Sequence, residues 1–291
     1  MTETEPGSKA TSLSEPGLYL ISTPIGNLGD ITLRSLKALE GAAEIYCEDT
    51  RVTAKLLNHF GIAKKTLPYH EHNAHKVRPG LVKKLSSGLP IALVSDAGTP
   101  MVNDPGYKLV QDCIEQSIPI HALPGASATL PALQLSGLPS NEFMFIGFFP
   151  VKEKARRDKL SALKNINATF IAFETAPRLL KTLNAIKEIL PNAQVSVSRE
   201  LTKKFEETRR GTVGELVSHY TEAGPPKGEI VMVFTQGGDD QDDANEEMID
   251  AFLSDALATL SVKDASKETA VRFKLPKKQA YERALMLKGE Q

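Results

Sequence analysis

Short apolar runs alternate along the chain with longer segments whose apolar residues recur at helical spacing. In the first part of the chain the apolar runs predict strands at Leu18–Ser22, Glu44–Cys47, Pro90–Ser95 and Pro119–Leu123. The segments between them predict helices at Thr32–Leu39, Thr50–Phe60, Val77–Leu85 and Tyr107–Glu115. Because strands and helices alternate, we expect a mainly parallel sheet that helices cover on both faces.

A second series begins after Leu135–Phe143, a stretch with Gly and Pro that we interpret as a domain junction. Its strands are predicted at Phe143–Gly147, Thr169–Phe173, Ala193–Ser198 and Glu229–Phe234. Its helices are predicted at Lys154–Lys164, Pro177–Ile189 and Val213–Tyr220. We therefore expect one α/β domain over residues 17–137 and a second over residues 138–238.

The charge pattern separates the end of the chain from these two domains. Residues 239–250 hold seven acids and no Lys or Arg, which predicts a solvated linker. From Ser261 to Lys288 eight bases stand against three acids at helical apolar spacing, and KLPKK interrupts the pattern. Residues 251–291 are thus predicted to form a small helix-turn-helix module, which either contacts nucleic acid or merely caps the enzyme.

Composition narrows the class of protein. The 291 residues are 41% hydrophobic, but no apolar run approaches the ~20 residues of a membrane span, so we expect no membrane partner. The polar start, residues 1–16, is interpreted as a disordered tail and not as a secretory signal. Cys47 and Cys113 lie in no metal-ligand spacing, which favours reduced thiols in a cytoplasmic protein and no metal site. With a net charge of -1, any nucleic-acid surface must be a local patch.

Five loops follow predicted strands, where ligands of α/β sheets gather. They are Thr23–Asp30, Cys47–Arg51, Val94–Gly106, Leu123–Ala128 and Phe173–Arg178. The first matches neither a phosphate-binding P-loop nor a dinucleotide fingerprint. In the third, five small or polar residues from 95 to 99 favour contact with a ligand, although a simple turn is the alternative, and Asp104 is interpreted as a helix cap.

Together these loops resemble a known family. STPIGNLGDITLRSLKAL, CEDTR, SDAGTPMVNDPG, LPGASA, GLPSNEF, GFFP, RELTKKFEE and KGEIV occur in an order that is similar to the ribosomal RNA small subunit methyltransferase I family. Members are cytidine 2'-O-methyltransferases of the tetrapyrrole-methylase superfamily. The resemblance spans Gly17 to Thr235, and the tail module also resembles the family's C-terminal extension. It implies two α/β domains of tetrapyrrole-methylase type with the cofactor cleft between them, a small C-terminal helical module, and a homodimer.

The resemblance also implies the ligands and the residues that hold them. The cofactor would be S-adenosyl-L-methionine, and the first loop would line its cleft. The acceptor would be 16S rRNA in the small ribosomal subunit. Binding of the methyl donor is carried over to Pro24, Ser95, Asp96, Ala97, Gly98, Thr99, Val102, Ser127, Ala128, Leu201, Gly228, Glu229 and Ile230. Because a cation beside a sulfonium is repelled, we expect backbone groups and small side chains there.

A ribose hydroxyl is a poor nucleophile, so we expect a base within its reach. Candidates are Asp49, His70, His72, Glu174 and Glu200, of which we favour Asp49, His72 and Glu200. Asp49 is alternatively a helix cap, His70 a structural residue, and Glu200 the partner of a nearby cation. Contacts with RNA phosphates are predicted for Arg51, Arg156, Arg157, Arg178, Arg199, Lys203, Lys277 and Lys278. Phe148 or Phe149 is a candidate for stacking on a base.

Three hypotheses follow. The first is methylation of a cytidine ribose of 16S rRNA in the decoding centre. The second is a tetrapyrrole methyltransferase that acts on a precorrin or uroporphyrinogen, which the basic tail disfavours because a small porphyrinoid needs no cationic appendage. The third is a non-catalytic RNA-binding ribosome assembly factor that retains the pocket as a scaffold.

Overall fold

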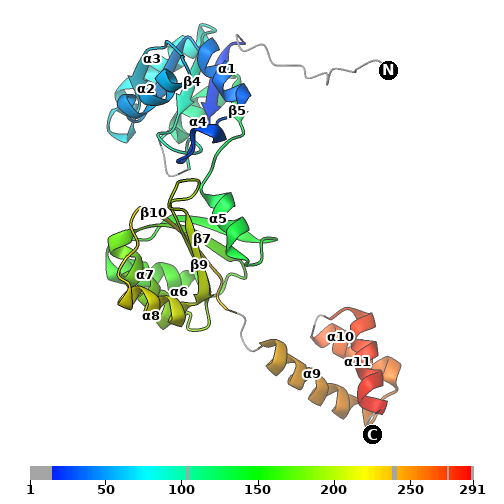
Figure 1. Ribbon diagram of the computed structural model, residues 1–291. Coiled ribbons are helices and arrows are strands. Elements are labelled where there is room, and N and C mark those ends of the chain that lie inside the picture. Colours follow the sequence, from blue (N-terminus) through cyan, green and yellow to red (C-terminus); the bar gives the residue numbers. More distant parts are fainter. Residues whose placement is uncertain (1–14, 103–104, 238–240, 274, 290–291) are drawn as a thin grey trace, which may run out of the picture. The chain divides into compact units, whose positions relative to one another are not determined.

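The computed structural model describes residues 15–102, 105–237, 241–273 and 275–289. The chain divides into two compact units, of which one ends at Thr235 and the other begins at Gln236 (Figure 1). Residues 1–14 of the predicted tail, the expected cap Asp104, and Asp239 and Asp240 of the predicted linker lie outside the described residues.

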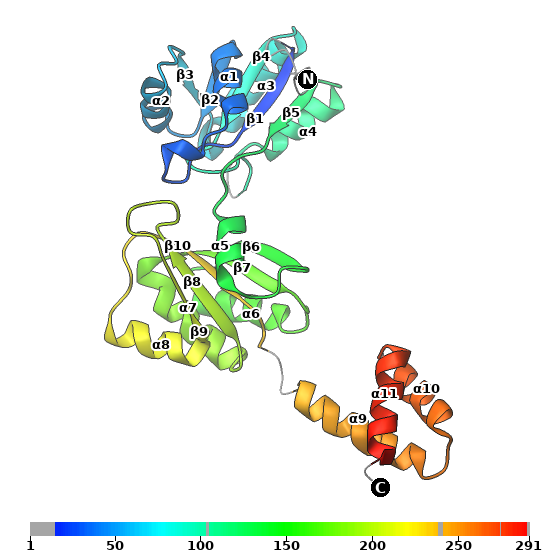
Figure 2. The same ribbon diagram turned by 45° about the vertical axis from the view of Figure 1, so that its right-hand side comes forward.

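The first sheet is parallel throughout and has the strand order β3-β2-β4-β1-β5 (Figure 2). Its strands are β1 Gly17–Ile21, β2 Glu44–Cys47, β3 Thr66–Pro68, β4 Pro90–Val94 and β5 Ile120–Leu123. One face packs on α1 (Leu33–Gly41) and α2 (Thr50–His59), and the other packs on α3 (Glu71–Ser86) and α4 (Tyr107–Glu115). The predicted parallel sheet with helices on both faces is confirmed.

Two parts of this first region differ from the prediction. Strand β3 was missed because it has three residues, sits at the sheet edge and ends in Pro68. Helix α3 begins at Glu71, six residues before the predicted start at Val77. Its first turns are polar, so the apolar period that predicted the helix becomes visible only in its second half.

The second sheet is mixed, with the order β6-β7-β10-β8-β9. Its strands are β6 Phe143–Phe148, β7 Thr169–Thr175, β8 Gln194–Arg199, β9 Glu207–Thr212 and β10 Glu229–Phe234. Only β6 and β7 pair in parallel, and the other three pairs are antiparallel. Helices α6 (Glu153–Leu163), α7 (Ala176–Ile189) and α8 (Val213–Glu222) pack on one face of this sheet. Strand β9 was missed because its sequence, ETRRGT, carries charge instead of an apolar run.

Helix α5 (Thr129–Ser136) moves the junction between the two regions. We expected the junction at Leu135–Phe143, which would place residues 129–136 with the first sheet. Ala132 and Leu133 instead pack against Ile171 and Val231 on the free face of the second sheet. The chain therefore leaves the first sheet directly after β5, because the apolar face of α5 covers the second core.

The described residues of the second unit form three helices, α9 (Gln241–Leu257), α10 (Val262–Arg272) and α11 (Lys277–Gly289). The predicted linker is wrong from residue 241 onward, because α9 starts there. Ile249 and Leu253 give α9 an apolar face that packs on Ala265 and Ala284. The break at KLPKK is confirmed between α10 and α11.

Two smaller expectations concern the cysteines and membranes. Cys47 and Cys113 are both buried and free. In the described part of the chain, every helix is too short or too polar to span a bilayer.

Candidate functional site

The loops at the carboxyl ends of β1 and β4 are joined through their backbones. Thr23 and Gly98 exchange two N–H to carbonyl hydrogen bonds, each of 2.9 Å, and the Thr23 hydroxyl donates to the Ser95 carbonyl at 2.9 Å. Gly98 has φ = +85°, and a Cβ there would lie 3.2 Å from Cγ2 of Ile25. Glycine therefore permits both the backbone conformation and the close approach of the two loops.

Hydroxyl groups extend this wall to the loop after β5. Ser22 Oγ donates to Thr99 Oγ1 at 3.2 Å, and Thr99 Oγ1 donates to the Ala126 carbonyl at 3.1 Å. A Cβ on Gly125 would lie only 2.8 Å from Cβ of Ser22. Three loops from neighbouring parallel strands thus form one continuous wall, and Thr99 serves to hold them together.

The opposite wall comes from the second sheet, where the end of β7 lies beside the start of β10. Thr175 pairs with Glu229 in antiparallel register. Glu200 supports this edge, because its Oε1 accepts a hydrogen bond of 3.0 Å from the Glu229 N–H and another of 3.0 Å from Lys203 Nζ. Gly228 has φ = +98°, and a Cβ there would lie 2.3 Å from Glu200 Oε1. Glycine at position 228 therefore permits both this backbone conformation and the close approach of the Glu200 carboxylate.

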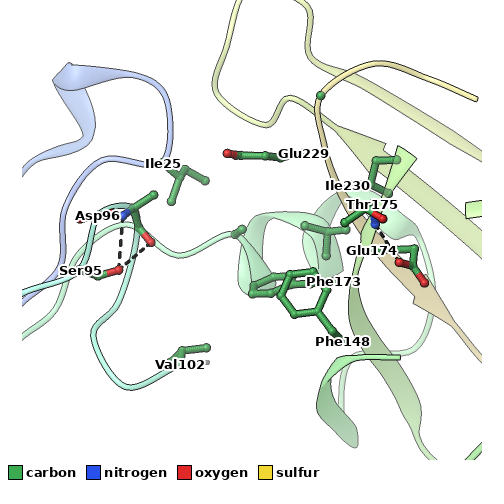
Figure 3. A pocket seen from close by; sticks show the side chains of 14 residues that line it. Ile25, Ser95, Asp96, Val102, Phe148, Phe173, Glu174, Thr175, Glu229 and Ile230 are labelled. Carbon is green, nitrogen blue, oxygen red and sulfur yellow. Dashed lines mark hydrogen bonds between the residues drawn. The ribbon is translucent and has the colours of Figure 1, made fainter. Parts of the chain in front are cut away.

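Between these walls lies a pocket of about 410 Å³, the main pocket. Its lining residues are Ile25, Ser95, Asp96, Ala97, Val102, Ala128, Phe148, Phe173, Glu174, Thr175, Gly228, Glu229, Ile230 and Val231. Figure 3 shows Ile25 and Val102 on one side, with Phe148 and Phe173 on the other. Of these 14 described residues three are acids and none is Lys or Arg. The pocket thus offers apolar walls to a ring and negative charge to a cation.

The main pocket brings together eight of the expected donor contacts, namely Ser95, Asp96, Ala97, Val102, Ala128, Gly228, Glu229 and Ile230. Five others lie outside its lining: Pro24, Gly98, Thr99, Ser127 and Leu201. Gly98 and Thr99 join loops, and Leu201 is buried among the apolar residues that cover α5.

Four lining residues were not singled out from the sequence, and two were expected in other roles. Ile25 belongs to the loop Thr23–Asp30 that was expected to line the cleft, and Phe173 and Thr175 belong to the candidate loop Phe173–Arg178, whereas Val231 follows from the antiparallel pairing, which the sequence did not reveal. Phe148 was expected to stack on a base and Glu174 to act as a base. Glu174 is fully buried, accepts from Thr182 Oγ1 at 2.6 Å and pairs with Arg178 Nε at 3.2 Å, so it is already engaged.

The three favoured bases lie in other surroundings. Asp49 caps α2 by accepting from the Arg51 N–H at 2.8 Å, and hydrogen bonds from the Arg51 side chain lower the pKa of Asp49 to about 2. His72 is exposed on α3 and lies outside the lining of the main pocket. The hydrogen bonds from Glu229 and Lys203 lower the pKa of Glu200. None of these three residues belongs to the lining of the main pocket.

Asp96 differs from the three. Its Oδ1 accepts from the Asp49 N–H at 2.9 Å, and it lines the main pocket. Burial raises the pKa of Asp96, and the Asp49 carboxylate raises that pKa further against the opposing hydrogen bond. Asp96 is therefore the more basic carboxylate of the wall.

Most of the expected RNA-binding cations of the first unit already have acidic partners. Arg51 pairs with Asp49, Arg157 with Glu188, Arg178 with Glu174, Arg199 with Glu207, and Lys203 with Glu200 and Glu229. Arg156 is only 4% exposed, which contradicts its predicted contact with RNA. It lies on the buried side of α6, a side that charge spacing alone did not reveal.

The second unit has a basic hollow of about 520 Å³ between α10 and α11. Its lining residues are Lys263, Ser266, Lys267, Lys277, Lys278 and Tyr281. Four lysines around one tyrosine combine positive charge with a ring that can stack, as single-stranded nucleic acid requires. Lys278 Nζ lies 3.9 Å from Glu282, and both side chains are exposed, so this weak pair leaves the lysine accessible.

Two known protein families match this chain, one in each unit. Residues 17–217 match the family described as Tetrapyrrole (Corrin/Porphyrin) Methylases, and residues 242–288 match the RsmI C-terminal HTH domain. Among solved structures, the fold is similar to a uroporphyrin-III C-methyl transferase from Thermus thermophilus complexed with S-adenyl homocysteine. That match has a TM-score of 0.52 and 17% identity, and covers 75% of this chain and 96% of the other.

Relatives along nearly the whole chain are closer in sequence. The chain is 46% identical to a ribosomal RNA small subunit methyltransferase I of Mesorhizobium japonicum, with 94% of this chain and 93% of the relative covered. It is 50% identical to the protein of the same name from Erythrobacter litoralis, with 94% and 96% covered. With both sheets, the pocket-forming loops and the helical unit all matched, this chain belongs to the ribosomal RNA small subunit methyltransferase I family.

Proposed function

We propose that this protein transfers a methyl group from S-adenosyl-L-methionine to the ribose 2'-hydroxyl of a cytidine in the decoding centre of 16S rRNA. Family membership supports methylation of ribosomal RNA. The observation that carries the choice of donor is the lining of the main pocket, with three acids and no Lys or Arg among its described residues. Glu174 and Glu229 pair with Arg178 and Lys203 outside the lining, which leaves Asp96 as the acid without a cationic partner among the described residues. A sulfonium is stable in such surroundings, whereas a triphosphate would be repelled.

The residues of the main pocket fit the donor. When bound, S-adenosyl-L-methionine supplies an electrophilic methyl group. Ile25, Val102 and Phe173 offer apolar surface to an adenine ring, and the turn from Ser95 to Ala97 brings backbone groups to the wall. Glu229 at the facing edge pairs with Lys203, but its side chain is 76% exposed and offers its carboxylate to the ammonium of the methionine part as well. We include Pro24, Gly98, Thr99, Ser127 and Leu201 in this proposal as residues that shape the walls.

Positioning accounts for much of the catalysis in this proposal. Holding an acceptor oxygen in line with the methyl carbon is worth roughly 7–11 kcal/mol of the barrier. The wall that Thr23 and Gly98 fasten and the edge that Glu200 supports keep the pocket in shape. Asp49 and Glu200 therefore contribute as positioning residues, and His72, exposed on α3, stays a candidate for contact with the RNA.

RNA contact is proposed for the second unit and for the exposed cations of the first. Lys277 and Lys278 lie at the start of α11 beside Tyr281, and Arg51 is 85% exposed despite its pair with Asp49. Replacing both Lys277 and Lys278 with alanine should weaken binding to small subunits. The slope of log affinity against log salt concentration should fall by the amount expected for the loss of about two phosphate contacts. Donor affinity, measured by calorimetry, should stay unchanged.

The decisive experiment incubates the protein with small ribosomal subunits that lack the modification and with tritiated donor. We expect label in 16S rRNA, and mass mapping of digested RNA should place one methyl group on the ribose of a cytidine. Label in a uroporphyrinogen but not in RNA would favour the tetrapyrrole alternative. Tight binding to subunits without any transfer would favour the assembly-factor alternative. A homodimer and a cytoplasmic location also remain predictions, which sedimentation and cell fractionation test.

A further inference from the structure

A second hollow lies beside the main pocket and shares a wall with it. This side pocket, of about 380 Å³, is formed by the first loop, by α2 and by the end of β4. Its lining residues are Thr23, Pro24, Gly26, Leu28, Val52, Thr53, Lys55, Leu56, His59, Ser95 and Asp96. Ser95 and Asp96 line both pockets, so these two residues lie between a ligand in one pocket and a ligand in the other.

Resting on the proposed function, we propose that the side pocket binds the acceptor nucleotide of the RNA and that the Asp96 carboxylate takes the proton of its ribose hydroxyl. Asp96 would thus be a catalytic residue that contacts the acceptor as well as the donor. Lys55 would bind a phosphate of the same nucleotide.

The position of the Asp96 carboxylate supports this role. The Asp49 N–H, at the start of α2, donates to Asp96 Oδ1 at 2.9 Å. That hydrogen bond holds the carboxylate toward the helix that forms the side pocket, while Ser95 and Ala97 on either side line the main pocket. Burial raises the pKa of Asp96, which makes it a better proton acceptor than Asp49.

The face that α2 turns to the side pocket suits a nucleotide. Val52, Lys55, Leu56 and His59 are spaced as one side of a helix. Val52 is 41% exposed and, with Leu28 at 38%, leaves apolar surface open to a base or sugar face. Among the described residues Lys55 has no carboxylate partner, in contrast to the paired cations Arg157, Arg178, Arg199 and Lys203. A free ammonium beside an apolar hollow is suited to a phosphate.

The chemical step balances with these groups. The ribose oxygen forms a bond to the methyl carbon while the bond between that carbon and the donor sulfur breaks. The electron pair of the broken bond stays on sulfur, which becomes a neutral thioether. The hydroxyl proton passes to the Asp96 carboxylate and then to water, so no further reactant is needed.

Two variants separate the two halves of the proposal. Lys55→Ala should weaken binding to unmodified small subunits by ~3–10-fold and leave donor affinity unchanged. The slope of log affinity against log salt concentration should fall by the amount expected for the loss of about one phosphate contact. The matched control is Lys83→Ala, an exposed lysine on α3 at the opposite face of the first sheet, which should change neither affinity. If Lys55→Ala weakens donor binding and leaves subunit binding intact, the side pocket belongs to the donor and the proposal is overturned.

Asp96→Asn should retain affinity for the small subunit within about twofold, because the amide oxygen still accepts the Asp49 N–H. Donor affinity should fall, because the variant neutralises one of the three acids of the main pocket, so transfer is measured at saturating donor. Single-turnover methyl transfer should fall by ~10²–10⁴-fold, and the rise of the rate with pH through the pKa of Asp96 should disappear. Transfer at the wild-type rate by this variant would overturn the catalytic role. If the wild-type protein itself transfers no methyl group to the subunit, the proposed function fails instead, and the Lys55 binding data still report on the side pocket.

Discussion

The two sheets of the first unit build their walls of the main pocket in different ways. In the first sheet all strands are parallel, so the loops after β1, β4 and β5 meet at one edge and join through Thr23, Gly98 and Thr99. In the second sheet the wall forms where β7 ends beside the start of the antiparallel β10. Turn geometry holds the first wall, whereas the hydrogen-bonded carboxylates of Glu174 and Glu200 hold the second.

Because the two walls are held in different ways, we expect different kinds of substitution to disrupt them. The first wall should be sensitive to backbone strain and to side-chain bulk, since glycine allows its loops to approach. The second should be sensitive to the loss of charge, since Glu174 and Glu200 each satisfy several donors at once. Substitutions matched between the walls can test this contrast.

The largest effect is expected in the second wall. Glu174→Ala should reduce the free energy of unfolding by about 3 kcal/mol, because it leaves Arg178 and Thr182 without their buried acceptor. Urea denaturation measures the change. The exposed Glu142→Ala serves as control and should change stability by less than about 0.5 kcal/mol. Equal stability of the two variants would remove the distinction between the walls.

The next effect concerns the first wall. Gly98→Val places a branched side chain at φ = +85° and a Cβ 3.2 Å from Ile25. We expect a loss of about 2 kcal/mol in unfolding free energy from backbone strain, together with weaker donor binding by calorimetry. Gly80→Ala is the opposite case, because it lies inside α3 with nothing within 4 Å of the added Cβ. It should stabilise the protein by about 0.5–1 kcal/mol. Similar losses in both variants would contradict the role of strain.

A smaller effect is the pH dependence of stability, which should have opposite signs for Asp96 in the first wall and Glu200 in the second. Burial raises the pKa of Asp96 above its ordinary value of 3.8, so ionising it costs stability as pH rises from 3.8 through the folded pKa. Hydrogen bonds lower the pKa of Glu200 below 4.5, so its ionised form contributes stability above pH 4.5 that is lost as pH falls through the folded pKa. At pH 7, Asp96→Asn should therefore raise the unfolding midpoint in urea and Glu200→Gln should lower it. The difference in urea midpoint between each variant and the wild type should shrink at acidic pH. If both variants change the midpoint in the same direction at pH 7, the opposite effects expected for the two carboxylates are refuted.

The smallest effect is expected for a surface pair far from either wall. Arg157 pairs with Glu188 on the exposed sides of α6 and α7. Because such pairs are screened by solvent, Arg157→Ala should leave the melting temperature unchanged within error. Subunit binding should change less than in the Lys55→Ala variant, since the Arg157 guanidinium already has a partner. A larger loss of subunit binding than in Lys55→Ala would move the RNA surface to the second sheet.

The sequence by itself determined the α/β class, most strands and helices of both sheets, and the loops of the first wall. It did so because apolar period, glycine and proline act locally, and because parallel strands bring successive loops to one edge. It also indicated that Ser95 to Ala97 and Gly228 to Ile230 belong to one pocket, through resemblance to a family.

Only the tertiary structure decided which charged side chains are free. Asp49 and Glu200 were favoured as bases, but hydrogen bonds from Arg51 and from Glu229 lower their pKa values. Arg156 was expected at the surface and is buried. Packing also assigned α5 to the second sheet and converted most of the acidic run into α9. These outcomes depend on partners distant in the chain, and the basicity or accessibility of a charged group depends on burial and on those partners, which local sequence does not encode.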